Sequence, residues 1–297
     1  MIRFKIFKIN ISYIFHLFRK NTIKGAKKNI RAHYDMGNDF FEEWLDSNMQ
    51  YSSAHFERDN QTLEEAQKNK FKKLENYLSL NDGEKLLEIG CGWGTLSQYL
   101  FNNNQIDIDA ITISKEQLSF VKKLNIKDSF NNCSFDIKDY RNLFTNYNKI
   151  ISIEMIEAVG EKYLPLYLRK IRECTRDDGF AIIQGITISD KKYKEYSNQV
   201  DFIQKYIFPG GFLPNKNTIN KLVSNNGLTV NSYISYADHY ANTLAIWRNE
   251  FNKKWDLIKN QGFDNTFKRM WEFYLSYCEA GFKSKNIDLI QFSLQNK

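Results

Sequence analysis

Apolar positions along this chain recur with two periods, and these periods predict where helices and strands lie. From Thr62 to Leu80 apolar side chains recur at three- and four-residue steps, and Asn81-Asp82-Gly83 ends the run, which indicates a helix. From Lys85 onward, short apolar runs alternate with helical patterns, which predicts a parallel sheet covered on both faces. The predicted strands are 85–89, 106–113, 132–136, 148–154 and 179–187, and the predicted helices are 95–102, 115–124 and 163–176.

The C-terminal third adds helices and two strands after an aromatic insertion. Helical patterns fall near 215–226, 241–260 and 264–283, with strands at 230–235 and, antiparallel and last, 290–294. The insertion, Asp190–Pro214, contains a Pro209-Gly210-Gly211 turn that is suited to hinge a lid. Its aromatic residues are Tyr193, Tyr196, Phe202, Tyr206, Phe208 and Phe212. We therefore expect an α/β protein with a mostly parallel, seven-stranded sheet, divided into a domain at 31–297 and an arm at 1–30.

A glycine-rich turn follows the first predicted strand. Gly90, Gly92 and Gly94 come directly after the apolar run Leu86–Ile89, and a helical pattern begins behind them. Glycine lets the backbone approach a ligand closely and adopt positive φ angles. Glu88 would repel a pyrophosphate but suits a ligand with a cationic or hydroxyl-rich part. The turn resembles motif I of S-adenosylmethionine (SAM) methyltransferases, and a tight turn that binds nothing is the alternative.

Other cofactors fit the sequence poorly. A NAD-binding fold would have an acidic residue near the end of the second strand for the ribose, where this chain has Thr112 and Ser114. The four cysteines form no C-x-x-C pair, and the four histidines are scattered. We therefore expect no metal, no disulfide framework and a reducing compartment.

Positive charge is concentrated at the N-terminus. Nine of the 42 basic residues and none of the 35 acidic ones lie in residues 1–34, so the remainder has a net charge of −2. This distribution argues against a nucleic-acid groove across the body. Residues 1–20 mix basic and bulky apolar side chains, but their longest uncharged run, Ile9–Phe18, is too short to span a bilayer. We expect a cytoplasmic protein whose arm binds the inner membrane surface; a helix packed on the body is the alternative.

Several short motifs occur in a specific order from Arg31 to the C-terminus. They are Ala32-His33-Tyr34-Asp35, Gly37-Asn38-Asp39-Phe40-Phe41, Met49-Gln50-Tyr51-Ser52, Leu87 to Gly94, Thr112-Ile113-Ser114, Gln117, Asp139-Tyr140-Arg141, Met155-Ile156-Glu157-Ala158-Val159-Gly160, Lys205 to Gly211, Tyr240, Thr243-Leu244 and Trp247. With them the chain resembles the cyclopropane-fatty-acyl-phospholipid synthase family, which is related to the mycolic acid cyclopropane synthases. The resemblance implies the Rossmann-like fold of SAM-dependent methyltransferases. The phospholipid enzymes usually carry a longer N-terminal domain than this chain has.

The resemblance also implies a reaction. The methyl group of SAM would add to a cis double bond in an acyl chain of a membrane phospholipid, leaving a carbocation and S-adenosylhomocysteine (SAH). A base would then remove a proton from the new methyl group, and a cyclopropane ring would close. The alternative is a methylene- or methyl-branched product, which the Gln184-Gly185-Ile186-Thr187 segment motivates. A non-catalytic lipid-binding protein and a soluble small-molecule methyltransferase also stay open, as does a homodimer.

Candidate site residues follow from the same resemblance. The expected SAM-binding residues are Tyr34, Tyr51, Ser52, Glu88, Gly90, Gly92, Gly94, Thr112, Ser114, Gln117 and Asp139. The base of the family is implied to be a bound bicarbonate ion, in a cage that maps onto Ser53, Glu157, Gln184, Ile186 and Tyr240. Ser53 and Gln184 stand where the phospholipid enzymes have Cys and His. Cys278 matches a cysteine sometimes assigned as catalytic, although the chemistry needs no covalent nucleophile and we favour a structural role.

Overall fold

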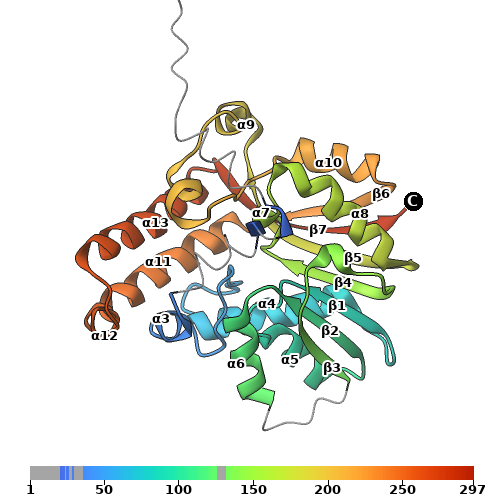
Figure 1. Cartoon of the computed structure of the whole chain (residues 1–297), viewed down its shortest axis with the longest axis horizontal. Coiled ribbons are helices and arrows are strands. Elements are labelled where there is room, and N and C mark those ends of the chain that lie inside the picture. The colour runs from blue at the N-terminus through green and yellow to red at the C-terminus, as the bar shows by residue number, and fades with distance from the viewer. Residues whose placement is uncertain (1–20, 24, 27–28, 30–35, 126–131) are drawn as a thin grey trace, which may run out of the picture.

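The computed structural model describes residues 21–23, 25–26, 29, 36–125 and 132–297 (Figure 1). The predicted membrane segment at residues 1–20 and the expected SAM ligand Tyr34 lie outside these described residues. Both therefore stay predictions.

A seven-stranded sheet forms the centre of the described part, in the order β3-β2-β1-β4-β5-β7-β6 (Figure 1). β7 runs antiparallel to β5 and β6, and the other neighbouring pairs are parallel, which confirms the expected fold class. The strands are β1 Lys85–Ile89, β2 Asp107–Thr112, β3 Cys133–Ile137, β4 Tyr147–Ile153, β5 Thr175–Ile188, β6 Leu228–Ser235 and β7 Ile287–Asn296. The prediction of 179 as the start of β5 was wrong, because pairing with β4 already begins at Thr175.

Helices cover both faces of the sheet. Residues from α4, α5 and α6 pack in one apolar cluster, and residues from α8 and α10 pack in another. The helices are α3 Asn38–Glu42, α4 Leu63–Leu78, α5 Thr95–Asn103, α6 Lys115–Asn125, α7 Ile156–Val159, α8 Leu164–Cys174, α9 Asp190–Tyr196, α10 Lys216–Asn225, α11 Ala237–Lys253, α12 Trp255–Asn260 and α13 Asn265–Lys283. A capping box between Thr62 and Glu65 fixes the start of α4. In the described part, no helix is both long and apolar enough to cross a membrane.

An aromatic cluster lies beside the sheet, where α11 and α13 pack together with α3 (Figure 1). Its fully buried centre includes Phe40, Trp44, Trp247 and Trp271, with neighbouring rings 5 to 6 Å apart. The predicted single helix at 241–260 was wrong: α11 ends at Lys253 and α12 begins at Trp255. Trp255 is buried, and its ring lies 5.7 Å from that of Phe251.

Candidate active site

The glycine turn connects β1 to α5 at the carboxyl edge of the sheet. Gly90, Gly92 and Gly94 all have positive φ, at 82°, 55° and 81°. A Cβ atom on Gly94 would lie 2.8 Å from Phe135 and 2.9 Å from Val121, so a side chain cannot be added there without repacking. The local backbone therefore needs these residues, as the sequence predicted.

A cavity of about 230 Å³ opens against this turn. Eight of the expected SAM-binding residues line it: Tyr51, Ser52, Glu88, Gly90, Gly92, Thr112, Gln117 and Asp139. Gly94 and Ser114 are not among the lining residues. Ser114 instead accepts a hydrogen bond from Gln117 N at the start of α6, while Thr112 donates to Gln117 Oε1 at 2.8 Å. We call this space the cofactor pocket.

Two ionisable side chains are buried in the wall of the cofactor pocket. Glu88 accepts a short hydrogen bond from Ser97, and burial raises its pKa to about 7. Lys70 donates to Ser52 Oγ at 2.7 Å and to Gln50 Oε1 at 3.2 Å, and burial lowers its pKa to about 8. Lys70 was not predicted as a site residue, because in the sequence it is only one position of the helical pattern that predicts α4.

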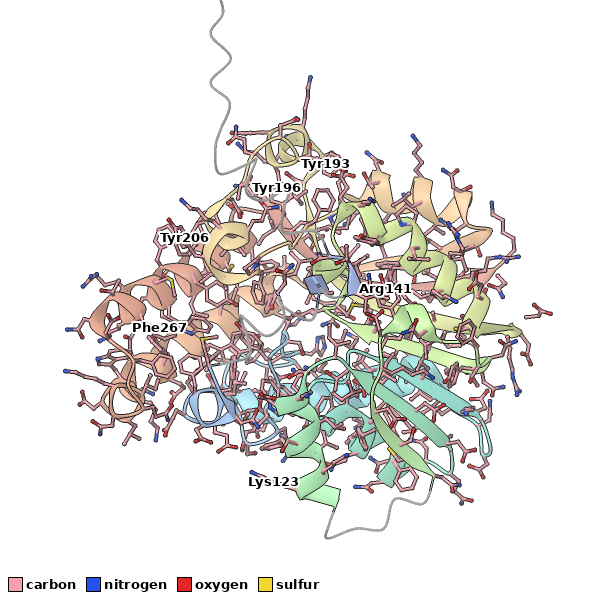
Figure 2. The ribbon with its side chains drawn as sticks, viewed as in Figure 1. Lys123, Arg141, Tyr193, Tyr196, Tyr206 and Phe267 are labelled. Carbon is pink, nitrogen blue, oxygen red and sulfur yellow. The ribbon has the colours of Figure 1, made fainter. Side chains whose placement is uncertain are left out.

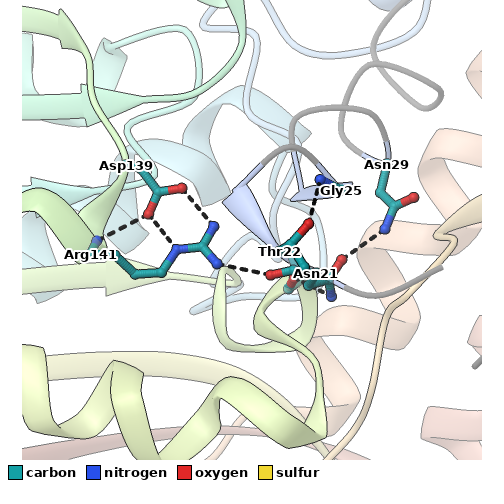
Figure 3. A network of polar contacts seen from close by, with 7 residues as sticks. Asn21, Thr22, Gly25, Asn29, Asp139 and Arg141 are labelled. Carbon is teal, nitrogen blue, oxygen red and sulfur yellow. Dashed lines mark hydrogen bonds and ion pairs between the residues drawn. The ribbon is translucent and has the colours of Figure 1, made fainter. Parts of the chain in front are cut away.

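Asp139 is held in place by Arg141 on one side of the cofactor pocket (Figure 3). Arg141 donates from Nε to Oδ1 at 2.8 Å and from Nη2 to Oδ2 at 2.7 Å. Its Nη1 donates to the carbonyl of Asn21, which in turn donates to the carbonyls of Ala158 and Gly210. These contacts do not test the expected contact between Asp139 and the adenine of SAM, which stays a prediction. Asn21 belongs to the predicted arm, yet it packs against the body and lines the pocket.

A second cavity, of about 610 Å³, lies next to the cofactor pocket. Its wall combines α13 and α11 with the aromatic insertion, including Tyr196, Phe208 and Phe212, and most of its surface is apolar. We call it the acyl cavity. Tyr193 and Tyr196 belong to α9, and Figure 2 shows Tyr206 nearer to α13. Of these three, Tyr196 is a lining residue.

The two cavities meet at a shared wall, the junction. The residues that line both cavities are Tyr51, Glu154, Glu157, Phe208 and Gly211. Groups bound in the two cavities would face each other here. Two of the five shared residues, Glu154 and Glu157, are carboxylic acids. Of these two, only Glu157 was predicted from the sequence as a site residue.

Glu154 is a candidate functional residue that was not predicted from the sequence. It follows β4 directly, and its buried carboxylate accepts three hydrogen bonds: from Ser53 N at 2.9 Å, Gln184 Nε2 at 2.9 Å and Tyr240 Oη at 2.6 Å. Burial raises its pKa, and these donors together with Lys70 oppose the rise. A carboxylate at the end of a buried parallel strand, next to the strand that carries Glu88, was the signal that could have identified it.

Glu157, one turn further, accepts a short hydrogen bond from Ile186 N. Burial, together with the neighbouring Glu154, raises its pKa to about 8. Its Oε2 atom has no hydrogen-bond partner in the part of the chain that the structure describes. This shift favours the protonated form of the Glu157 side chain near neutral pH.

The residues of the expected bicarbonate cage lie together, but their hydrogen-bond donors bind two carboxyl groups of the protein. The donors at Ser53, Gln184 and Tyr240 all bind Glu154, and the donor at Ile186 binds Glu157. The Ser53 hydroxyl donates to the Ala54 carbonyl, so only its backbone N–H takes part. This arrangement does not fit a bicarbonate ion, because its donors are already bonded to side chains of the protein.

Cys278 lies in the wall of the acyl cavity and is not among the residues that line the junction. Burial raises the pKa of its thiol, so it is not a reactive thiolate at neutral pH. Its position is consistent with the structural role that we favoured.

A model of the family described as mycolic acid cyclopropane synthetase matches residues 21–292. The chain belongs to this family. The tuberculostearic acid methyltransferase UfaA1 of Mycobacterium tuberculosis is 36% identical over 278 residues, which cover 91% of this chain and 65% of the relative. The cyclopropane-fatty-acyl-phospholipid synthase of Escherichia coli is 33% identical over 275 residues, which cover 93% of this chain and 69% of the relative.

A solved structure agrees with the family assignment. Mycolic acid cyclopropane synthase CmaA1, complexed with SAH and CTAB, matches with a TM-score of 0.84 at 30% identity, covering 91% of this chain and 98% of that one. The family resemblance is thereby confirmed, and the chain is a SAM-dependent methyltransferase. The chain spans about two-thirds of the length of UfaA1.

Proposed function

We propose that the chain transfers the SAM methyl group to a cis double bond in an acyl chain of a membrane phospholipid, giving a cyclopropane and SAH. The supporting observation is the junction, where a polar cofactor pocket meets an apolar cavity across two carboxyl groups. An alkene is a weak nucleophile, so catalysis depends on holding it in line with the sulfonium methyl group, away from water.

The walls of the acyl cavity support this reaction. Aromatic rings surround it near the junction, including Tyr51, whose hydroxyl lies 2.8 Å from that of Tyr274, and Tyr240, whose ring lies 4.5 Å from Phe282. The electron-rich face of such a ring stabilises a nearby cation by about 2 kcal/mol when water is excluded. The cavity therefore suits both an apolar chain and the carbocation that methyl transfer produces.

An exposed aromatic patch supports a bilayer as the source of substrate. It consists of Phe202, Tyr206, Phe273 and Tyr277, with ring centroids 4.7 to 5.8 Å apart between neighbours. Tyr206, Phe273 and Tyr277 are 52%, 51% and 44% exposed, and Tyr277 also lines the acyl cavity. Aromatic side chains favour the membrane–water interface. The patch would bring the cavity to the bilayer, with the N-terminal basic segment as a second contact.

The test is an assay of the pure protein with vesicles of a monounsaturated phospholipid and methyl-labelled SAM. We expect labelled acyl chains that have gained one carbon, with NMR signals of cyclopropane protons. Unaltered acyl chains in the presence of bound SAM would contradict the proposal. Activity on small soluble acceptors without vesicles would favour a different substrate class.

A methylene- or methyl-branched product is the second candidate, supported by the 36% identity to UfaA1, a tuberculostearic acid methyltransferase. After methyl addition, a hydride shift from the methyl-bearing carbon to the neighbouring cation would move the positive charge. Loss of a proton from the methyl group would then give an exocyclic C=C bond without a ring. NMR separates the two outcomes, because exocyclic methylene protons and cyclopropane protons resonate far apart.

A further inference from the structure

Glu154 occupies the position at which the family resemblance places an exogenous oxyanion. Its three hydrogen-bond donors come from separate parts of the fold: the loop before α4, strand β5 and helix α11. Each belongs to the expected cage, namely Ser53, Gln184 and Tyr240. Three convergent donors are what a buried carboxylate needs to stay ionised.

A second anion would have no support at this position. Adding bicarbonate beside Glu154 would place two negative charges in contact, and the donors that could stabilise the added ion are in use. Glu157 does not relieve this shortage, because it takes the remaining cage donor, Ile186 N. The uncompensated burial of charge disfavours such an arrangement.

The backbone at Glu154 points to the same conclusion. Its φ angle is +51°, in the left-handed region that side chains other than glycine disfavour. A non-glycine residue in this conformation at a cavity wall indicates that its side chain has a use there. In this conformation the carboxylate accepts hydrogen bonds from Gln184 and Tyr240. Glu154 N also donates to the Gln184 carbonyl at 2.8 Å.

The charges around Glu154 are arranged for proton acceptance. Lys70 from α4 provides positive charge, burial favours the protonated form of Glu157, and the Tyr240 hydroxyl donates to the carboxylate. Burial makes the carboxylate more basic than an exposed one, which favours it as a general base. Among the described residues, no other carboxyl group of the junction has both the donors to stay ionised and a place in both cavity walls.

We infer that Glu154 is the base of the reaction, a carboxylate built into the chain in place of bound bicarbonate. This inference rests on the proposed methyl transfer to an alkene. The S–CH₃ bond of SAM breaks and its electron pair stays on sulfur, while the alkene electron pair forms the new C–CH₃ bond. A C–H bond of that methyl group then breaks. The proton passes to a Glu154 oxygen, and the electron pair forms the ring C–C bond or, once a hydride shift has moved the cation to the methyl-bearing carbon, the exocyclic C=C bond.

Two substitutions at one position test the inference. In Glu154→Gln the side chain keeps its size but cannot accept the proton, so we expect turnover to fall about 10²- to 10⁴-fold. Glu154→Gly removes the carboxylate from a backbone that glycine tolerates, so we expect a similar loss that added bicarbonate partly restores in a concentration-dependent way. Glu173→Gln, an exposed carboxyl on α8, is the matched control and should keep full turnover.

The wild-type protein provides a readout that does not depend on any variant. We expect its turnover to stay unchanged when dissolved carbon dioxide and bicarbonate are removed. Calorimetric SAM binding and circular dichroism show whether each variant is folded. Wild-type turnover that requires bicarbonate, or a folded Glu154→Gln protein of normal activity, would overturn the inference and leave the proposed function standing. Absence of wild-type turnover on unsaturated vesicles, with and without bicarbonate, would overturn both.

Discussion

The cofactor pocket and the acyl cavity are built in different ways. The cofactor pocket uses strand ends and tight turns, and most of its wall comes from residues 86–159. The acyl cavity collects side chains from Tyr51 to Ile287, on segments that are distant in sequence. A site made of backbone turns leaves a local pattern in the sequence, whereas a site made of apolar side chains looks like ordinary core.

The largest effect on folding is expected at the glycine turn beside the cofactor pocket, where the backbone is packed most tightly. Gly94→Ala combines a positive φ with a Cβ 2.8 Å from Phe135, so we expect a loss of about 2–5 kcal/mol in unfolding free energy. Gly83→Ala has a similar φ but open space around it, and should cost about 1–2 kcal/mol. Urea unfolding measures both. Equal losses would show that packing around the turn is unimportant.

A second effect concerns two acids that line the cofactor pocket, Glu88 and Glu157. Burial raises the pKa of Glu157 to about 8 and that of Glu88 to about 7, above the ordinary glutamate value of 4.5. Between about pH 5 and pH 8 these two groups bind more protons in the folded than in the unfolded state, so they lower stability as pH rises, by up to about 1.4 kcal/mol per unit for each group. His55, whose pKa burial lowers from 6.5 to about 4, opposes this decline below pH 6.5, so the decline should be clearest above that pH. Chemical unfolding across this range should show the decline.

Substitution of one acid isolates its share of that decline. Glu157→Gln mimics the protonated form, so its stability should depend less steeply on pH between 5 and 8 than that of the wild type. An unchanged slope would mean that Glu157 is already ionised in the folded protein. Because Gln resembles the protonated side chain, turnover at pH 7 should stay within about tenfold of wild type, far above that of Glu154→Gln.

The aromatic patch should make a moderate contribution on the side of the acyl cavity. We expect the double variant Tyr206→Ser, Phe273→Ser to bind unsaturated phospholipid vesicles about tenfold more weakly, since it removes two apolar side chains from the interface. Phe144→Ser is the matched control, because Phe144 is 84% exposed and does not belong to the patch. Vesicle co-sedimentation measures binding. Equal weakening by the control would remove the reason for placing the bilayer at this patch.

The smallest effect is expected at Cys278. Its thiol is protonated and lies away from the junction, so Cys278→Ala should leave kcat/KM within about threefold of the wild type. A loss of a hundredfold or more in the folded variant would show that the thiol has a chemical role. The expected small change would identify the residue as part of the wall.

The sequence allowed the strands and most helices to be predicted, because each depends on a local period of apolar residues. It did not allow the residues of the junction to be recognised fully. Glu154 becomes important only because β4 pairs with β5, which places Ile153 opposite Gln184. Asn21 likewise acquires its role through contacts with Ala158 and Gly210, far away in the chain. The break at Lys254 interrupts a helical pattern that the sequence continues to residue 260, so that pattern does not reveal it.

The left-handed backbone at Glu154 has a genetic consequence. A glutamate codon becomes a glycine codon by a change of its middle base, and at this position the main chain already has a conformation that glycine adopts without strain. The variant would keep this backbone conformation but lose the carboxylate, and with it the hydrogen bonds from Ser53, Gln184 and Tyr240. One nucleotide would then separate a self-sufficient catalyst from one whose rate follows the carbonate chemistry of its surroundings.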